Sequence, residues 1–435
     1  MIAFHYPPSF GSSGIQRTLT FSRELLSHNW QPLILTANTR AYPRILTPSL
    51  REIPQAVPVF RAFALDSSRH LAFRGSYCKW LGIPDRWVSW WLGAVYVGLR
   101  IIRKYQPDVI WSTYPIATAH LIGMTLSYLC RIPWIADFRD SMTEDNYPTD
   151  PTIRKTFQCI ERMTVRRCQV AVFTTPGTRR MYAERFPSIP SSKWVITGNG
   201  YDEETFHAIE NAFVPPSRSK KPMVLVHSGL LYPSERNPLP FFSSLADLKQ
   251  RQMISQTNLK IILRASGHEE FYRSHVQSIG IDDIVLFEDA IPYQDAIREM
   301  LHCDGLLLFQ GSNCNHQIPA KLYEYLRAGR PIFALTDPRG DTANVLTDAG
   351  VPTIVPLDSK EQIVRGLVKF LSLIREGRGA IPIKWKSSNI LVKPGLRSSP
   401  NYWIRLLNNK KDDPVNLISK TAFPRDQRRI YVEVL

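Results

Sequence analysis

Residues 305–335 read GLLLFQGSNCNHQIPAKLYEYLRAGRPIFAL. Two short apolar runs, Gly305–Phe309 and Pro331–Leu335, enclose a segment with helical spacing whose first turn Pro319 can open. This order is typical of two parallel strands joined by a helix, because parallel strands need a long crossover between them. The stretch therefore predicts a parallel sheet covered by helices.

The same alternation extends through most of the chain, in two series. Helical patterns such as Ile15–Leu26 and Phe157–Cys168 separate the predicted strands. The first series contains Ile2–His5, Pro32–Ala37, Val57–Ala64, Asp108–Ser112, Trp134–Asp137, Val170–Thr174 and Trp194–Thr197. The second adds Met223–His227, Leu259–Leu263, Ile284–Phe287 and Thr353–Val355 to the two runs above.

Two such series predict the α/β class, with two Rossmann-like, doubly wound domains that face each other across a cleft. We place an N-terminal domain at residues 1–207, a proline-bearing linker at 208–222, a C-terminal domain at 223–385 and a basic tail at 386–435. The tail is expected to pack partly on the N-terminal domain. Ligands of such sheets bind beyond the carboxyl ends of the strands, so the loops there are the candidate site.

The charge and the spacing of the cysteines argue against some classes of function. The chain has 54 basic and 38 acidic residues, a net charge of +16, and the tail alone holds ten basic and four acidic residues. The remaining charge is diffuse and no nucleic-acid-binding motif accompanies it, so we expect no nucleic-acid partner. The six cysteines form no CxxC pair and no zinc spacing, which predicts a reduced, cytoplasmic protein without a metal site.

An apolar segment raises the question of a membrane. Trp87–Leu99 is uncharged over 13 residues, whereas a spanning helix needs about 20. Within Trp80–Ile102, tryptophans and flanking arginines suit an anionic lipid surface, but the i,i+4 row Trp87, Trp91, Val95 and Leu99 suits core packing equally well. We expect a buried helix interior, with exposed ends and the basic tail docking peripherally on the inner face of the cell membrane.

Three loops carry candidate ligand-binding residues. Gly11-Ser12-Ser13-Gly14 follows the first predicted strand, and its small residues let a ligand approach the helix N-terminus beyond. Arg236, just before Pro238, lies at a predicted helix entrance where a guanidinium can bind phosphate. The alternatives are an ordinary tight turn and a solvated surface arginine.

The third loop leads into Lys321 and Glu324, which share one face of the helix that Pro319 opens. A lysine in the first turn of a helix opposes the helix dipole, and a bound diphosphate would explain it. Glu324 is suited to accept hydrogen bonds from ribose hydroxyls. The alternative is a simple i,i+3 ion pair.

Taken together, these stretches resemble the family-4 glycosyltransferases of the GT-B fold, in particular their bacterial polysaccharide-assembly branch. The similar segments follow one another over roughly residues 1–375. They are His5-Tyr-Pro-Pro with Gly11–Gly14, Ile132–Asp140, Thr197–Asp202, Gly229 with Arg236-Asn-Pro238, and Ile318–Tyr325.

The resemblance implies a nucleotide-sugar donor held mainly by the C-terminal domain and an acceptor held mainly by the N-terminal one. It implies that Arg236 contacts the donor diphosphate, that Glu324 contacts the ribose, and that Gly11, Ser12, Ser13 and Gly14 close over the donor. We also expect Gly229 to be a donor-binding residue. It also implies hexosyltransferase-like transfer to a saccharide or polyprenyl-linked acceptor, with retained anomeric configuration. We expect no metal or cofactor, because Arg236, Lys321 and nearby helix N-termini can stabilise the leaving phosphate electrostatically.

Three positions depart from the family pattern. His316 stands where the first acid of the paired motif is expected, Arg139 replaces a common histidine, and Leu230 replaces a basic residue. We expect Lys321 to supply the missing charge and His316 to remain at the donor. Asp137, Arg139 and Asp140 are the candidates in the N-terminal domain, with either carboxylate, or the leaving phosphate, accepting the proton of the acceptor hydroxyl.

Two other functions stay open: a sugar-nucleotide epimerase of similar architecture, which needs no acceptor, and a catalytically impaired binding or scaffold protein on the same fold. The Lys321–Glu324 segment favours transfer, whereas His316, Arg139 and Leu230 motivate the scaffold.

Overall fold

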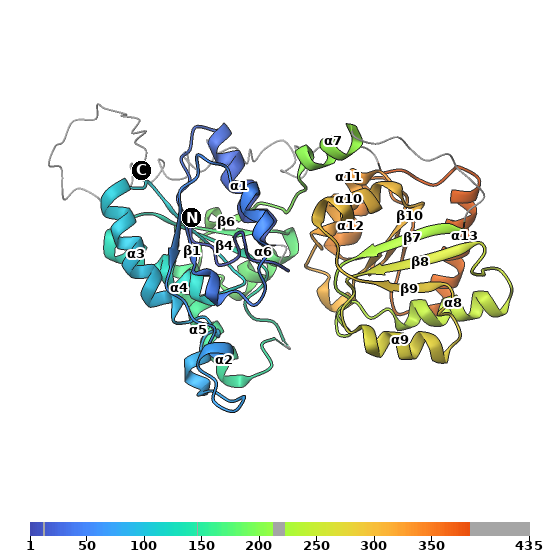
Figure 1. Cartoon of the computed structure of the whole chain (residues 1–435), viewed down its shortest axis with the longest axis horizontal. Coiled ribbons are helices and arrows are strands. Elements are labelled where there is room, and N and C mark those ends of the chain that lie inside the picture. Colours follow the sequence, from blue (N-terminus) through green and yellow to red (C-terminus); the bar gives the residue numbers. More distant parts are fainter. Residues whose placement is uncertain (12–13, 146, 212–221, 383–435) are drawn as a thin grey trace.

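The computed structural model describes residues 1–11, 14–145, 147–211 and 222–382 of the chain. Two α/β domains lie side by side along the long axis, and helix α7 (Glu203–Asn211) lies near the passage between them (Figure 1). All strand pairs are parallel, with β1–β6 in the first domain and β7–β12 in the second. The predicted class of two Rossmann-like domains is confirmed.

The first domain holds its strands in two groups. Strands β3 (Ile110–Thr113), β4 (Trp134–Arg139), β5 (Val170–Phe173) and β6 (Trp194–Ile196) pair in that order, and β1 (Ile34–Ala37) pairs with β2 (Val59–Ala62). Ile2 joins the groups by bridging Leu35 and Ser112. The prediction of a strand at Ile2–His5 is wrong in extent, because the backbone hydrogen bonds to both neighbours involve only Met1–Ala3.

Helices cover both faces of this first sheet. Residues of α3, α4, α5 and α6 pack on one face, around Trp90, Trp134 and Phe138, while Leu19 of α1 packs on the other. The helices of this domain are α1 (Gly14–Ser27), α2 (Ser67–His70), α3 (Trp90–Tyr105), α4 (Ala117–Cys130), α5 (Pro151–Arg167) and α6 (Pro176–Arg185). The 3₁₀ turns are Thr39–Ala41, Thr47–Glu52, Lys79–Gly82 and Ser191–Lys193.

Helix α3 is rotated relative to the predicted packing row. It buries Trp90, Ala94, Gly98 and Ile101, whereas Leu99 is 38% exposed. Gly98 permits this orientation, because a Cβ there would lie 2.5 Å from Cδ1 of Leu126 in the neighbouring α4. The predicted core row Trp87, Trp91, Val95 and Leu99 is thus corrected: its first three members are partly buried at the edge of the core. No helix of the described residues combines the length and apolarity needed to span a bilayer.

The second domain is a single sheet in the order β12-β11-β10-β7-β8-β9. Every strand predicted in this half of the sequence is present. The strands are β7 (Met223–Ser228), β8 (Leu259–Arg264), β9 (Val285–Glu288), β10 (Gly305–Phe309), β11 (Ile332–Leu335) and β12 (Ile354–Val355). Between them run α8 (Leu239–Gln250), α9 (Glu269–Ser278), α10 (Tyr293–His302), the 3₁₀ turn Ser312–Cys314, α11 (Lys321–Ala328), α12 (Asp341–Asp348) and α13 (Lys360–Arg375).

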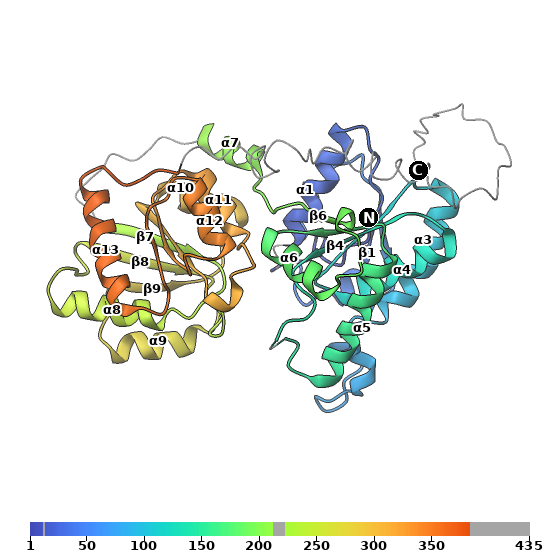
Figure 2. The ribbon, with the colours of Figure 1, turned by 180° about the vertical axis from the view of Figure 1, so that it is seen from behind.

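The two faces of the second sheet have different neighbours. Helices α8, α9 and α13 pack on one face, and α7, α10, α11 and α12 pack on the other. The second group lies on the side nearer the first domain, as both views show (Figures 1 and 2). Helix α11 therefore begins close to the space between the domains.

The predicted boundaries of the domains, the linker and the tail can be compared with the structure only in part. Helix α7 crosses the expected boundary at residue 207, and its Phe206 and Ile209 pack in the core of the second domain. Most of the predicted linker, residues 212–221, and the whole basic tail at 386–435 lie outside the described residues. Those assignments stay predictions.

Candidate functional site

A cavity of about 1610 Å³ opens between the two domains. The first domain lines it with Gly11, Arg17 and the Thr197–Asp202 segment, and the second domain with residues that include Ser228, Tyr293 and Glu324. Gly11 has a φ of +88°, which favours glycine, and Gly14 begins α1. Ser12 and Ser13 lie outside the described residues. Residues of both sheets thus meet at one crevice, as the sequence predicts for facing domains.

Two cations are brought together at the carboxyl end of β7. Lys321 is the first residue of α11, and its Nζ lies 3.1 Å from Nε2 of His227 on β7. Arg236 lies in the loop after β7, donates through Nη1 to the Leu230 carbonyl at 3.4 Å, and packs over the Tyr232 ring. Burial, together with the charge of Arg236, holds the pKa of Lys321 well below its ordinary value, although Glu324 opposes the shift.

This pair has unused capacity for an anion. Nε of Arg236 is buried and has no hydrogen-bond partner among the described residues. No salt bridge to Arg236 or Lys321 is formed by any carboxylate of the same part of the chain. Gly229, with a φ of +102°, keeps the approach open, because a Cβ there would lie 3.1 Å from the Lys321 Nζ. The arrangement suits a diphosphate, which would relieve the mutual repulsion of the two cations.

Glu324 lies one turn beyond Lys321 and faces the cavity. Its Oε1 accepts a hydrogen bond from the Tyr293 hydroxyl at 3.0 Å. Burial raises the pKa of Glu324 to about 7, against the opposing effects of Tyr293 and Lys321. A carboxyl group in this state can accept hydrogen bonds from a ligand hydroxyl more strongly once it is ionised.

The raised pKa of Glu324 predicts how the substitution Glu324→Gln changes the stability of the protein at each pH. The native carboxyl favours its protonated form, so its contribution to stability is full below the ordinary pKa of 4.5 and is lost as the pH rises to about 7. We expect the variant to have a higher melting temperature than the wild type at pH 8, little difference at pH 4.5, and weaker nucleotide binding at pH 8. Melting curves at both pH values test this. An equal effect of the substitution on melting at the two pH values would contradict it.

Asp137 is engaged in a buried ion pair. Arg17 from α1 donates Nε to its Oδ2 at 3.0 Å and Nη2 to its Oδ1 at 2.9 Å, and the Thr113 hydroxyl donates to Oδ2 at 3.0 Å. Asp137 is fully buried. Arg17 also donates to the carbonyls of Thr197 and Gly198, so it ties α1 to the loop after β6. The structure therefore gives Asp137 a framework contact, and of the two predicted carboxylates only Asp140 remains accessible.

Arg139 and Asp140 end β4 at a distortion of the sheet. The β4–β5 register shifts between Asp137 and Arg139, and Arg139 takes a φ of +45°. Nη1 of Arg139 donates to the Tyr114 carbonyl at 3.3 Å. Asp140 is exposed, yet crowding by neighbouring protein atoms raises its pKa, with Arg139 as the main opposing charge. The left-handed turn thus buries the guanidinium and presents the carboxylate.

Two further electrostatic effects in this region involve Asp140 and His5. Burial raises the pKa of the Tyr232 hydroxyl, and the charge of Asp140 adds a small effect in the same direction. Burial and Arg139 lower the pKa of His5 to about 3, which makes this imidazole neutral at pH 7. His5 thereby joins the candidate residues of the first domain.

His316 is the centre of a contact between the domains. Its Nε2 lies 2.9 Å from Oε1 of Glu144, and its carbonyl accepts from the hydroxyls of Thr175 at 2.5 Å and Thr178 at 3.1 Å. Burial acts against ionisation of Glu144, but the hydrogen bond and charge of His316 hold the pKa of Glu144 below its ordinary value. The side chain predicted at the donor is therefore occupied in joining the two domains.

The same contact extends to the start of α6. Gly177 donates its N–H to Oδ2 of Asp341 at 2.5 Å, and Arg180 pairs with the same carboxylate at 3.3 Å. A Cβ on Gly177 would lie 2.6 Å from Cα of His316, so the backbones of the two domains touch directly. Asp341 thus caps a helix of the opposite domain, which fixes the separation of the crevice walls.

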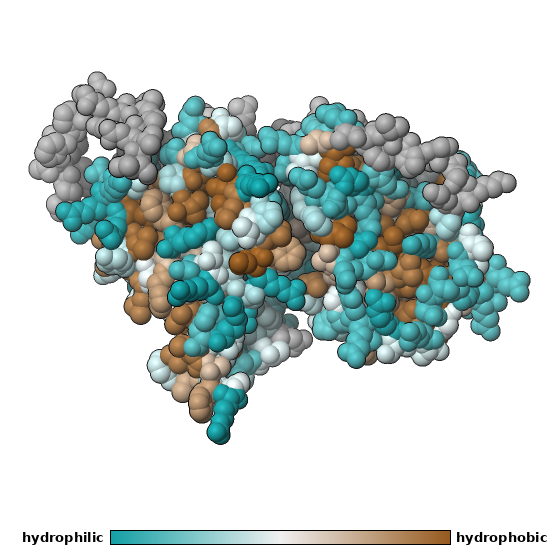
Figure 3. Space-filling view, viewed as in Figure 1, coloured by the Kyte–Doolittle hydropathy of each residue, from teal (hydrophilic) through white to brown (hydrophobic). Residues whose placement is uncertain are grey.

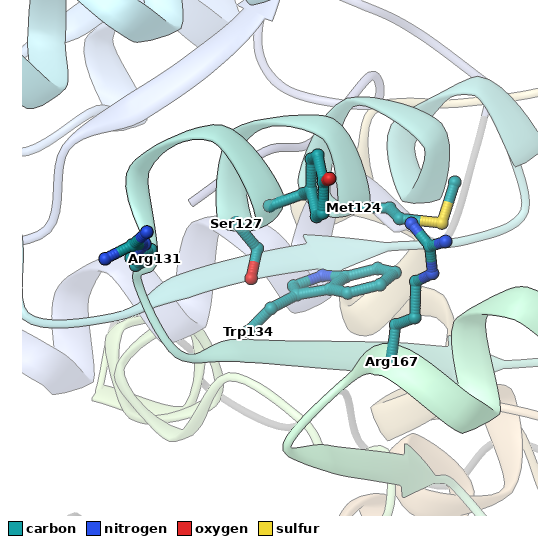
Figure 4. Close-up of a pocket in the computed structure, with 6 residues that line it drawn as sticks. Met124, Ser127, Arg131, Trp134 and Arg167 are labelled. Atoms are coloured by element: carbon teal, nitrogen blue, oxygen red, sulfur yellow. The ribbon is translucent and has the colours of Figure 1, made fainter. Parts of the chain in front are cut away.

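A second hollow lies on the first domain, away from the strand ends just described. Its cavity of about 510 Å³ is at the start of β4, between the ends of α4 and α5 (Figure 4). The lining residues are Met124, Ser127, Tyr128, Arg131, Trp134 and Arg167. None of the predicted site residues belongs to it. Among the described residues, no three His, Cys, Asp or Glu side chains are grouped as a metal site would require.

Several residues at the crevice escaped the sequence analysis. Arg17 follows Gly14 in the first turn of α1, the same dipole mismatch that marked Lys321, so a usable signal was present. His227 and Tyr293 carried no such signal, because a histidine at a strand end and a tyrosine at a helix start are ordinary. Glu144 could not be found, since its partner His316 lies 172 residues away.

Comparisons with known proteins agree with this architecture. Residues 14–200 match the model of the glycosyl transferase 4-like domain. No curated protein sequence matches the chain. Anabaena HepE in complex with UDP-glucose is similar in structure over 94% of this chain and 99% of its own, with 13% identity and a TM-score of 0.60.

Two further solved structures are similar at comparable levels. Sucrose-phosphate synthase from Thermosynechococcus elongatus covers 87% of this chain and 91% of its own, with 14% identity and a TM-score of 0.58. UDP-GlcNAc 2-epimerase from Neisseria meningitidis, bound to UDP-GlcNAc, covers 94% and 99%, with 13% identity and a TM-score of 0.53. At these identities the likeness is one of fold. The match to the glycosyl transferase 4-like domain model is confined to residues 14–200, and the chain has the GT-B fold that these solved structures share.

Proposed function

We propose that the protein transfers a sugar from a nucleotide-diphosphate sugar to a saccharide or polyprenyl-linked acceptor in the assembly of a cell-surface polysaccharide. The observation that carries the proposal is the Arg236–Lys321 cation pair at the carboxyl end of β7, next to the interdomain crevice that Ser228 and Glu324 line. Similar structures in complex with UDP-glucose and with UDP-GlcNAc support a nucleotide sugar as the ligand.

The chemistry follows from where charge develops. Breaking the bond between the anomeric carbon and the diphosphate places negative charge on the leaving phosphate, and Arg236 and Lys321 would stabilise it electrostatically. The N-terminus of α11, which Lys321 opens, adds a positive dipole end. In this proposal the residues of the chain carry the reaction without a metal or cofactor, and the anomeric configuration is retained.

The reaction also needs a group that accepts the proton of the acceptor hydroxyl. Of the two predicted carboxylates Asp140 is the exposed one, and the leaving phosphate is the alternative acceptor. Arg139, the neighbour of Asp140 in the chain, and neutral His5, whose pKa Arg139 lowers, would hold the reacting sugar and the acceptor by hydrogen bonds. Glu324 would bind the ribose hydroxyls of the donor, with Tyr293 fixing its orientation.

A sugar-nucleotide epimerase is the second candidate, and its support is the likeness to UDP-GlcNAc 2-epimerase. An epimerase would change the sugar of the donor without any acceptor. A transferase releases nucleoside diphosphate in proportion to acceptor, and a scaffold protein binds the donor without turnover.

These outcomes can be separated in two steps. A panel of nucleotide sugars is first screened for a rise in melting temperature, because a ligand that binds the native state stabilises it by mass action. The best ligand is then incubated with and without saccharide acceptors, and free nucleotide is measured. Acceptor-dependent release supports transfer. A new sugar nucleotide formed without acceptor, or binding with no product at all, would exclude it.

We further propose that the protein docks peripherally on the cytoplasmic face of an anionic membrane. Helix α2 and its surroundings project from the first domain, and apolar side chains are visible on this lobe (Figure 3). Phe73 is 78% exposed and Trp80 is 70% exposed, with Arg74 stacked on Phe73. Such a combination of aromatic and basic side chains suits the headgroup region. The basic tail, outside the described residues, would add charge.

Vesicle binding tests this docking. We expect sedimentation with phosphatidylglycerol vesicles at low salt, and about tenfold weaker binding for the double variant Phe73→Ser/Trp80→Ser, which loses two exposed aromatic contacts. Phe271→Ser is the control, because Phe271 is also an exposed aromatic residue, at 57%, but lies in the second domain. A protein that stays in solution at low salt would contradict the prediction, as would equal losses for the two variants.

A further inference from the structure

We propose that His227 is a positioning residue, which fixes the Lys321 ammonium against the diphosphate of the donor. This inference rests on the function proposed above, since it assigns the task of holding one member of the cation pair. His227 is fully buried at the end of β7, and the Nζ of Lys321 lies 3.1 Å from its Nε2.

Hydrogen bonds fix the tautomer of His227. Its Nδ1 lies 2.9 Å from the Leu307 carbonyl, which can only accept, so Nδ1 carries the proton. Nε2 is then the acceptor, and Lys321 donates to it from 3.1 Å. The pKa of His227 is held well below its ordinary value, chiefly by burial and then by the charge of Lys321. The imidazole therefore remains a neutral acceptor at physiological pH.

The surroundings leave His227 little freedom. The Phe309 ring meets the imidazole edge-on, with ring centroids 5.0 Å apart. One residue further along, the N–H of Ser228 donates to the Tyr325 hydroxyl at 2.9 Å, which ties the end of β7 to α11. The charged groups around the pair are Arg236, which acts on both His227 and Lys321, and Glu324, which acts on Lys321.

Holding the ammonium in advance should strengthen anion binding. A lysine side chain has several rotatable bonds, and ordering it when the ligand arrives opposes binding. One proton of the ammonium is directed to Nε2, and the remaining two are left for the ligand. Without the acceptor, Lys321 would have to be ordered by the diphosphate itself. His227 thus acts through Lys321 and touches no ligand atom.

A double-mutant cycle with inorganic pyrophosphate tests the proposal, because this probe does not depend on the nucleotide base. We expect His227→Phe, which keeps a ring but removes the acceptor, to weaken pyrophosphate binding about tenfold. His227→Gln can still accept a hydrogen bond and is expected to stay within about threefold of the wild type. In a Lys321→Ala background, His227→Phe should cause no further loss.

Controls separate this positioning role from stability. His120→Phe removes a buried imidazole from the first domain, where Nδ1 of His120 lies 2.8 Å from Oγ of Ser112. It should lower the melting temperature and leave pyrophosphate affinity unchanged. An equal loss for His227→Phe with and without Lys321 would overturn the inference, as would wild-type affinity in a folded His227→Phe protein. A wild type that binds neither pyrophosphate nor any nucleoside diphosphate would instead overturn the proposed function.

A measurement on the unaltered protein covers the case in which His227→Phe does not fold. Histidine nitrogen NMR of the wild type should show His227 with its proton on Nδ1, and adding pyrophosphate should perturb Nε2 and leave the tautomer unchanged. A proton on Nε2 in the free protein would exclude the acceptor role.

Discussion

Arg236→Ala and Lys321→Ala are each expected to lower the rate of sugar transfer by about two to three orders of magnitude, with the fold intact. The two side chains lie near the carboxyl end of β7, next to the crevice that Ser228 and Glu324 line, and we expect the leaving diphosphate to develop its negative charge there. The buried Nε of Arg236 has no partner among the described residues. Substitution of either removes a preorganised donor. The measurement is acceptor-dependent nucleotide release, with circular dichroism and melting curves to confirm folding.

A matched control addresses the general effect of removing a positive charge. Arg251 directly follows α8, and its side chain is 60% exposed and pairs with Asp247, so we use Arg251→Ala as the control. We expect transfer by this variant to equal that of the wild type. Near-normal transfer by both Arg236→Ala and Lys321→Ala would contradict the diphosphate-binding assignment.

Arg17→Met is expected to lower the free energy of unfolding of the first domain by about 3–5 kcal/mol. The substitution leaves the Asp137 carboxylate buried without its bidentate partner, and it also removes the donors to the loop carbonyls of Thr197 and Gly198. Urea unfolding, followed by the tryptophan fluorescence of this domain, measures the loss. Arg17→Met/Asp137→Asn should recover part of it, because the uncompensated charge is gone.

Arg23→Met is the control for this prediction. Arg23 lies on the same helix and also pairs with a carboxylate, Asp202, but its side chain is 28% exposed. A partly exposed pair of this kind contributes about 1 kcal/mol or less. Equal destabilisation by Arg17→Met and Arg23→Met would show that Asp137 does not depend on its buried partner.

The fold could be predicted from the sequence because the pattern that marks each strand or helix lies within a short stretch of consecutive residues. Each strand of the second domain is a short apolar run bounded by helical patterns, as in Gly305–Phe309 and Pro331–Leu335, and burial on both faces makes such runs continuous. Ile2–His5 has the same composition but pairs through one residue, which depends on how long its two neighbours remain in register. Residues close in the sequence do not encode that length.

The packing of α3 shows a similar limit. An i,i+4 row drifts around a helix, since 3.6 residues complete a turn. Trp90 and Gly98 face the core because Gly98 lets α4 approach, and this depends on Leu126 of the other helix. The sequence of α3 alone permits either orientation.

The candidate site was predictable only where its residues follow a strand end. Lys321 and Glu324 share one helix, and a dipole argument identifies them. The pairing of Asp137 with Arg17 joins residues 120 positions apart, and the pairing of His316 with Glu144 joins residues 172 apart. Such partners are brought together only by the tertiary fold. The sequence therefore identified Asp137 and His316 as candidates but did not indicate which side chains they pair with.

The central claim is that the crevice binds a nucleotide-diphosphate sugar through its two cations. A crystal structure with the nucleotide sugar that most raises the melting temperature tests it directly. We predict phosphate oxygens within hydrogen-bond distance of Arg236 Nε and Lys321 Nζ, with the ribose hydroxyls on the Glu324 carboxylate. A diphosphate bound elsewhere on the molecule, with Arg236 and Lys321 both untouched, would contradict the account.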